Sequence, residues 1–365
     1  MYLFKNYNSL IATFLALHFS NAVCGNESTF DVAGRLLLTE TPELFERIEL
    51  KDGYQLTQST FRGRFRESKA DKIDLNSVYE GISWTLSKSV EGGTGENETE
   101  YIFWLADING GKKGSAVVAG EFVAEREEDP RKMWVITGTG AYHRADIVGT
   151  WSVVQDTSGM QEASFGVDRS IDVQLSVTLD AADNDAPNTM SKMAYRADNP
   201  GGGKVIEDYV HELWADPKEF RDNRNFGDGW MLNRHGTVTK LIGAKSDHPL
   251  DGVETHIAYF VAYRPDKPLG GETHHNTIHS SSFGAVVDRD RDVFFQLAEY
   301  SPARGDTYVK SRSVYGTGKY RDASITASWR IPWPDGYPRL SDLQGMQGQD
   351  ILKYRIEFAK GAIPQ

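Results

Sequence analysis

The sequence contains a single cysteine, Cys24, among its 365 residues. A chain with one cysteine has no internal disulfide, so its stability must come from packed apolar cores. Basic residues are also in the minority, because 40 Lys and Arg stand against 52 Asp and Glu and give a net charge of −12. An acidic surface repels the phosphate backbone, so we expect no nucleic-acid partner.

Long apolar runs are scarce, and only residues 10–19 form one. This run follows Lys5 and precedes the small residues at 20–22. It is too short to cross a bilayer as a permanent helix, so we expect no stable membrane anchor. The order of positive charge, apolar run and small residues is typical of a secretory leader, and a buried N-terminal strand or helix is the alternative. The sequence therefore predicts a signal peptide over 1–25 and a secreted or periplasmic protein.

Helical periodicity is scarce as well, with only residues 41–48 and 216–223 spaced as in a helical turn or two. Alternation of period two dominates and predicts strands at 78–86, 101–107, 115–123, 171–179, 256–263, 283–287, 293–300 and 352–358. Many short strands with regular turn signals are typical of a β-sandwich or β-barrel. The chain is therefore expected to be all-β.

A fourteen-residue stretch occurs twice, at 138–151 and at 316–329, which are 178 residues apart. Both copies read Gly-Thr-Gly-x-Tyr-x-x-Ala-x-Ile-x-x-x-Trp. A period this long indicates duplicated domains rather than the units of a solenoid or propeller. We predict two domains, 30–180 and 206–362, joined by a linker over 181–205 that is rich in Asp, Asn, Pro and Gly.

Alternation within the repeated stretch places Ile147 and Trp151 on one face and Tyr142 on the other. Ile325 and Trp329 occupy the same face of the second copy. A row of small residues that ends in a large aromatic suits the inside of a closed sheet, with the indole at the floor of a cavity. Plain core packing without a cavity explains the same row equally well.

The repeated stretch resembles the dirigent protein and allene oxide cyclase family. The resemblance lies in the Gly-Thr-Gly element at 138–140 with its following Tyr and Ala, in the strand at 114–120 and in the closing strand at 352–358. It implies an eight-stranded antiparallel barrel with an apolar pocket, which guides ring closure or radical coupling of hydrophobic substrates without a bound cofactor. The expected fold is two tandem, calycin-like eight-stranded barrels of this type.

Two function classes follow from this expectation. In the first, a barrel binds a hydrophobic small molecule and steers its cyclisation or isomerisation without a cofactor. In the second, the protein is a non-catalytic secreted module that holds a lipid, a phenolic or a glycan. The aromatic candidates for ligand contact are Trp84, Trp104, Tyr142, Trp151, Tyr320 and Trp329.

Three residues are candidates for acid–base or charge chemistry. His143 and Arg321 occupy equivalent positions before the inward-facing row, where each would lie at the mouth of a lumen. Glu80 shares a face with Ile82 and Trp84, and a carboxylate among apolar neighbours would have a raised pKa suited to general acid or base work. The alternatives are solvated strand ends for the first two and, for Glu80, a bulge that turns it outward.

A histidine cluster is the best candidate for a metal site. His274, His275 and His279 fall in a loop bounded by glycines. Imidazoles close together bind zinc, copper or iron when further ligands converge on them. The cluster has no recognised ligand spacing, however, and the first repeat has other residues at these positions. The sequence therefore predicts no metal, with these histidines as weak candidates.

Overall fold

The computed structural model of the chain describes residues 28–66, 78–89, 97–109, 114–125, 131–142, 146–154, 169–179, 202–214, 221–243, 248–263, 277–300, 309–329 and 349–362. These residues form seventeen β-strands and short 3-10 turns, and no α-helix occurs among them. The all-β prediction is confirmed, and each predicted strand overlaps an observed one. The predicted signal peptide lies outside the described residues.

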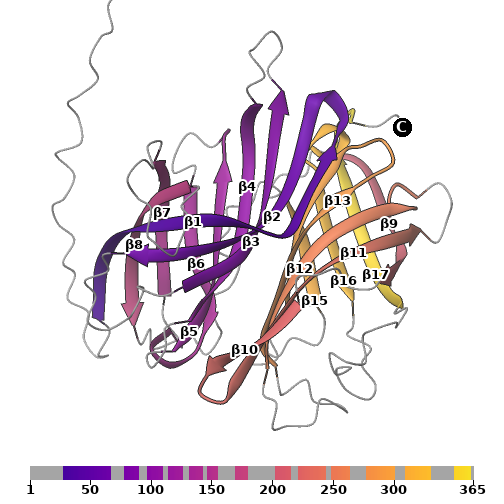
Figure 1. Ribbon diagram of the computed structural model, residues 1–365. Helices are drawn as coiled ribbons and strands as arrows, with labels where there is room; N and C mark the ends of the chain where they lie inside the picture. The colour runs from indigo at the N-terminus through magenta and orange to yellow at the C-terminus, as the bar shows by residue number, and fades with distance from the viewer. Residues whose placement is uncertain are drawn as a thin grey trace, which may run out of the picture.

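The first sheet contains the strands of the N-terminal half and is a closed barrel of antiparallel strands in chain order. Figure 1 shows it in indigo to magenta beside the orange and yellow strands of the second sheet. Its members are β1 (Ser28–Glu49), β2 (Tyr54–Arg66), β3 (Val78–Ser89), β4 (Asn97–Asn109), β5 (Ser115–Val123), β6 (Arg131–Gly138), β7 (Asp146–Val154) and β8 (Arg169–Leu179).

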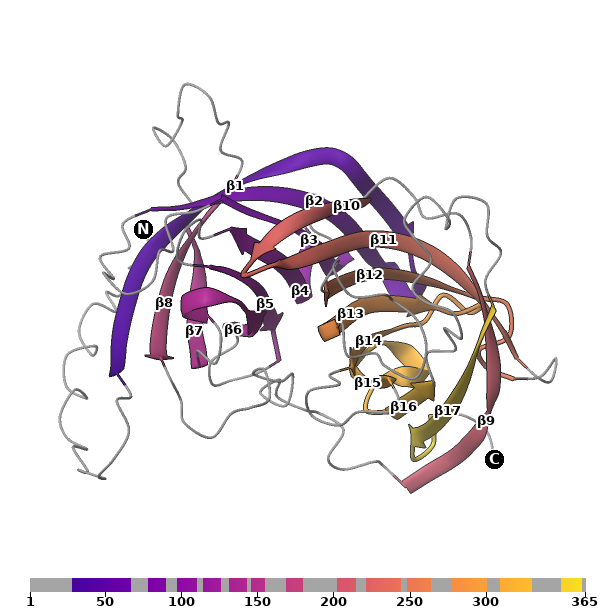
Figure 2. The ribbon, with the colours of Figure 1, turned by 90° about the horizontal axis from the view of Figure 1, so that it is seen from below.

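The second sheet is antiparallel too and has nine strands in the order β10-β11-β12-β13-β14-β15-β16-β17-β9, with a further pairing between β11 and β9. Seen from below, each sheet curves around its own interior (Figure 2). The members of the second sheet are β9 (Gly202–Trp214), β10 (Arg221–Gly227), β11 (Trp230–Gly243), β12 (Val253–Tyr263), β13 (Thr277–Val287), β14 (Val293–Tyr300), β15 (Val309–Gly316), β16 (Ser324–Trp329) and β17 (Gln349–Ala359). Strand β9 begins inside the stretch that was expected to be a linker.

The prediction of helical turns at 41–48 and 216–223 is wrong for the residues that the structure describes. Residues 41–48 belong to β1, which stays paired with β2 through a register shift between Thr41 and Phe45. Residues 221–223 belong to β10. Pairing with the neighbouring strand satisfies these backbone groups, so the weak helical spacing does not decide the conformation.

The two Gly-Thr-Gly elements make the same hydrogen bonds. The Thr139 amide donates to the Ser115 carbonyl at 2.8 Å, and the Thr317 amide donates to the Val293 carbonyl at 2.8 Å. In return, each threonine hydroxyl accepts from the same partner's amide, at 3.2 Å for Ser115 and 3.1 Å for Val293. Gly318 has a φ of +51°, and its counterpart in the first copy is also left-handed, which explains the glycine at this position.

A 3-10 turn follows each element and changes the face of the next tyrosine. Tyr142 ends the turn at 140–142 and is buried in the same apolar cluster as Trp151, while Tyr320 is buried with Ile325. The prediction that Tyr142 lies on the opposite face from Trp151 is therefore wrong. Simple alternation fails here because a helical turn separates the tyrosine from the strand that carries the tryptophan.

Three large apolar clusters alternate along the strands. On β4, for example, Trp104 and Ala106 belong to one cluster, whereas Phe103 and Leu105 belong to another. The cluster with Phe103 and Leu105 contains residues of both sheets, so it lies between them. The cluster with Trp104 and Ala106 lies inside the first sheet. A third cluster, with Ile325 among its members, lies inside the second sheet. Each sheet is therefore apolar on its inner face and also on the part of its outer face that meets the other sheet.

Aromatic rings dominate the interface between the sheets. Phe283 stacks on Phe103 with centroids 3.6 Å apart and meets Trp84 edge-on at 4.9 Å. Tyr101 of the first sheet stacks on Tyr315 of the second at 4.7 Å. Trp84, expected to contact a ligand, is thus fully buried between the sheets. Its strand presents it on the outer face, away from the barrel interior.

The turns of the two halves contact each other reciprocally. The β10–β11 turn reaches the first Gly-Thr-Gly element, where the Thr139 hydroxyl donates to the Phe226 carbonyl and the Gly140 amide donates to Asp228 Oδ2 at 2.7 Å. The β1–β2 turn reaches the β13–β14 turn, where the Lys51 amide donates to the Arg291 carbonyl at 3.0 Å. The corresponding turn of each half therefore contacts the other half, at the first Gly-Thr-Gly element in one direction and at the β13–β14 turn in the other.

Candidate functional site

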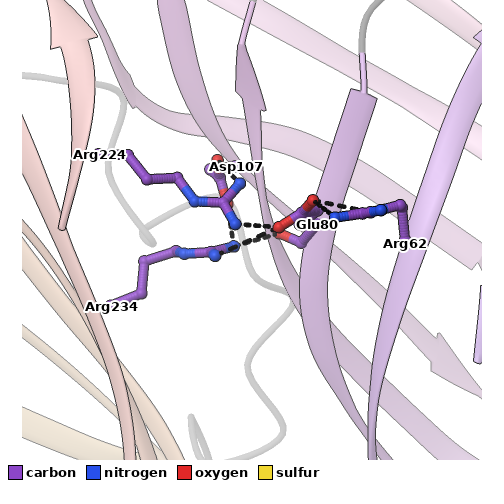
Figure 3. Close-up of polar contacts among 5 residues, drawn as sticks. All are labelled: Arg62, Glu80, Asp107, Arg224 and Arg234. Atoms are coloured by element: carbon purple, nitrogen blue, oxygen red, sulfur yellow. Dashed lines mark hydrogen bonds and ion pairs between the residues drawn. The ribbon is translucent and has the colours of Figure 1, made fainter. Parts of the chain in front are cut away.

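Glu80 lies at the centre of an ionic cluster that joins the two sheets (Figure 3). Arg62 on the neighbouring strand donates to Glu80 Oε1 at 2.8 Å, and Arg224 and Arg234 approach Glu80 Oε2 from the second sheet. Both of these arginines also pair with Asp107, which lies beside Glu80 on β4. We call these five residues the inter-sheet ionic cluster. It spans β2, β3 and β4 of one half and β10 and β11 of the other.

The ion pair at the core of this cluster is removed from water. The side chain of Arg234 is 2% exposed and that of Asp107 is 5% exposed, whereas Arg62 at the edge is 53% exposed. Buried charges are tolerated only when they are paired and hydrogen-bonded, which two carboxylates and three guanidinium groups achieve here. The buried ion pairs of the cluster therefore connect the two sheets directly.

The prediction of a raised pKa at Glu80 is wrong. Burial by itself raises the pKa of this carboxyl, but the hydrogen bonds from Arg224 and Arg62 and the charges of Arg224 and Arg234 outweigh burial and lower it below its ordinary value. The face of Glu80 was predicted correctly, because Ile82 and Trp84 point the same way. The guanidinium partners come from the other half of the chain. Glu80 is thus an ion-pair residue, poorly suited to general acid catalysis.

This lowered pKa predicts a dependence of stability on pH. A carboxyl whose folded-state pKa is depressed contributes stability above its unfolded value of 4.5 and loses it as the pH falls through the folded pKa. We expect Glu80→Gln to lower stability at pH 7 and to flatten the loss of stability between roughly pH 5 and pH 3. Urea unfolding at several pH values measures this. Glu98→Gln on the exposed face of β4 is the control, and an equal flattening there would contradict the assignment.

Of the other two charge candidates, the structure describes Arg321, which does not reach a barrel interior. Arg321 pairs with Glu125 of the first half, and its side chain is 46% exposed. Its guanidinium is therefore held at the surface between the sheets, away from the mouth of a lumen. His143 lies outside the described residues.

The histidine cluster receives no support from the described residues. Within the described part of the chain, no three His, Cys, Asp or Glu side chains gather in a group that could hold a metal ion. His274 and His275 lie outside the described residues, and His279 falls on β13, where its side chain is not described. The same part of the chain contains no helix that is long and apolar enough to cross a membrane.

Large aromatic side chains fill the interior of the first sheet. Trp104 lies across Gly120, where a Cβ atom would collide with the indole ring. Trp151 is buried in the same cluster, as predicted, and its Nε1 donates to the Lys132 carbonyl at 3.1 Å. The guanidinium of Arg131 lies over the Trp151 ring. The equivalent Trp329 is on β16, but its side chain is not described.

Smaller residues occupy the corresponding part of the second interior. In the first sheet, Trp104 pairs with Gly120, which in turn pairs with Met133. The register of β13, β14 and β15 gives the corresponding residues as Ser282, Ala298 and Ser311. An indole and a thioether chain are thus replaced by two hydroxymethyl groups.

Among the described side chains of the second interior, the apolar packing is interrupted at this level. One cluster runs through the whole first interior and includes Trp104, Met133 and Trp151. In the second interior, a small cluster of Ala298, Tyr300 and Val309 is separate from the main one. The interior faces of the two sheets therefore differ, although their strands correspond.

Polar side chains are buried within the second interior, and we call them the inner polar group. The Thr255 hydroxyl lies 2.6 Å from the Thr239 hydroxyl, which donates to Glu212 Oε1 at 2.7 Å. The Tyr354 hydroxyl donates to Gln296 Oε1 at 3.0 Å. Burial, followed by the charge of Glu212, raises the pKa of Tyr354, so its phenol stays protonated and acts as a donor. These five residues come from five different strands and are not adjacent in the sequence.

No protein-family model matches the chain, and no curated protein matches its sequence.

Proposed function

We propose that both sheets are eight-stranded barrels of the dirigent and allene oxide cyclase type, arranged as a tandem duplication. Strands β9 and β10 then count as the two halves of one strand, because both pair with β11 as the two halves of β1 pair with β2. The pairing of β9 with β11 also returns the second sheet on itself. The matching hydrogen bonds of the two Gly-Thr-Gly elements support the duplication.

We further propose that the protein is a secreted module that binds a small hydrophobic molecule inside a barrel. The observation that carries this proposal is the inner polar group. Buried polar groups in an otherwise apolar interior are costly unless they are satisfied. A few convergent polar groups within apolar walls are also what fixes the orientation of a ligand in a binding site. The main apolar cluster of the second interior supplies such walls.

Binding without catalysis is the function that this geometry supports best. The charge candidates Glu80 and Arg321 are both engaged in ion pairs outside the barrel interiors. Tyr354, which lies inside, is held as a neutral hydrogen-bond donor by its raised pKa. Steering of a cyclisation or isomerisation needs acid or base groups at the ligand, and neither Glu80 nor Arg321 lies there.

Equilibrium dialysis of the purified full chain against naphthalene tests the proposal. We expect saturable binding that is lost on unfolding in urea and that raises the thermal midpoint, because a ligand of the folded state stabilises it. Tyr209→Ser, which removes the most exposed large apolar side chain among the described residues (54% exposed), controls for adsorption to the surface. It should leave binding unchanged. Absence of saturable binding, or its loss in Tyr209→Ser, would overturn the proposed function.

A further inference from the structure

We infer that the chain has one ligand site, inside the second barrel, and that Ser282 and Ser311 create it. The first barrel is then a filled scaffold that binds nothing. This inference rests on the proposed function and adds to it the position of the site, its stoichiometry and the class of ligand. The ligand is a small, uncharged, largely apolar molecule.

The difference in side-chain volume between the two interiors is the first argument. Trp104 and Met133 fill the middle of the first barrel, and the second has Ser282 and Ser311 at the corresponding positions. The methyl group of Ala298, in place of a glycine, does not compensate for the lost indole. Protein interiors are close-packed, so a loss of this size leaves room unless another group enters. In the second barrel, the two separate apolar clusters of described residues mark the level at which we place that room.

An unsatisfied hydroxyl is the second argument. Ser311 is 5% exposed, and its Oγ has no hydrogen-bond partner among the described residues. A buried hydroxyl without a partner is costly, so a partner from outside the chain would stabilise it. Ser311 lies on β15 diagonally opposite Gln296 on β14, with both side chains on the interior face. Gln296 accepts from Tyr354 through Oε1, and the donor group Nε2 is on the same side chain.

Charge decides the class of ligand. The Glu212 carboxylate is buried in the same interior, and its charge already contributes to the raised pKa of Tyr354. In a medium of low dielectric constant, a second negative charge nearby is strongly disfavoured. A carboxylate or phosphate ligand would therefore be rejected, whereas an uncharged ring or chain would be accepted. The mostly hydrophobic walls provide the remaining affinity.

The test measures naphthalene and 2-naphthoate binding to the full chain by equilibrium dialysis. For the wild type we expect one naphthalene per chain and at least tenfold weaker binding of 2-naphthoate. Ser311→Met restores the residue of the first barrel and should weaken naphthalene binding at least tenfold. Thr326→Met on the exposed face of β16 adds the same side chain to the same sheet and should change the affinity less than twofold. Circular dichroism checks that each variant is folded.

Each outcome separates this inference from the proposed function. Saturable binding with two molecules per chain, or with unchanged affinity in Ser311→Met, would overturn the single site while leaving barrel binding in place. Equal binding of 2-naphthoate would overturn the ligand class. If Ser311→Met does not fold, Met133→Ser is measured in its place. A second naphthalene site that appears only in Met133→Ser supports the inference that the first barrel is filled. Two sites already present in the wild type contradict that inference.

Discussion

Replacement of Arg234 by methionine is expected to lower the free energy of unfolding by about 3–5 kcal/mol. Arg234 is 2% exposed and pairs with both Glu80 and Asp107 across the two sheets. Without its guanidinium, Asp107 stays buried and loses its ion pair with Arg234, whereas the longer contact to Arg224 at 3.5 Å remains. The loss therefore reflects a buried carboxylate with too few partners more than the removal of one attractive contact. Urea unfolding of the full chain measures it.

Arg62→Met is the matched control, because Arg62 also pairs with Glu80 but its side chain is 53% exposed. An exposed ion pair contributes about 0–1 kcal/mol, so this variant should stay close to the wild type. A double variant that combines Arg234→Met with Asp107→Asn should lose less than the sum of the two single losses, since the same ion pair is removed twice. Strict additivity would show that the two residues do not interact.

Truncation of Phe283 to alanine is expected to cost about 3–5 kcal/mol as well, as is usual for a buried phenylalanine. Its ring is fully buried between the sheets, stacked on Phe103 and edge-on to Trp84. The rings on both sides belong to strands of a rigid sheet, which limits the collapse of the cavity that the variant leaves. The fluorescence of Trp84, as part of the total emission, should shift to longer wavelength as water gains access.

Tyr209→Ala is the control for Phe283→Ala, because it removes an aromatic ring of similar size from an exposed position on β9. Exposed positions without special contacts usually change stability by no more than about 0.5 kcal/mol. If Phe283→Ala and Tyr209→Ala lost similar amounts, the two sheets would not depend on their aromatic interface. In that case the two sheets would be joined mainly by the chain that connects them.

The interface explains why a tandem chain has strongly apolar strands on two faces. The outer faces of β3 to β6 and β12 to β15 are buried against each other, and the inner faces are buried inside the sheets. In an isolated barrel only the inner face would be buried. A turn of each half also contacts the other half at the edge of this interface. The chain thus holds both apolar outer faces within one molecule, where each covers the other.

Features that depend on neighbours along the chain were predictable from the sequence. The strands at 115–123 and 293–300 follow from alternation, and the burial of Trp151 follows from its place on a regular strand. The shared Gly-Thr-Gly element predicted matching local structure, and its hydrogen bonds match in the two halves. Position-by-position comparison of the repeats also carries the signal for Ser282 and Ser311, since both lie 178 residues after a large side chain.

The tertiary structure alone decided which groups meet across the two halves. Alternation gave the face of Glu80 but could not place Arg234 beside it, because the two residues lie on different sheets and far apart in the chain. The pKa of Glu80 therefore moved in the direction opposite to the prediction. Trp84 was assigned to a pocket for the same reason, although its apolar partners are the rings of the second sheet. A sequence pattern reports whether a side chain is buried, whereas the charge and shape of what buries it depend on non-local packing.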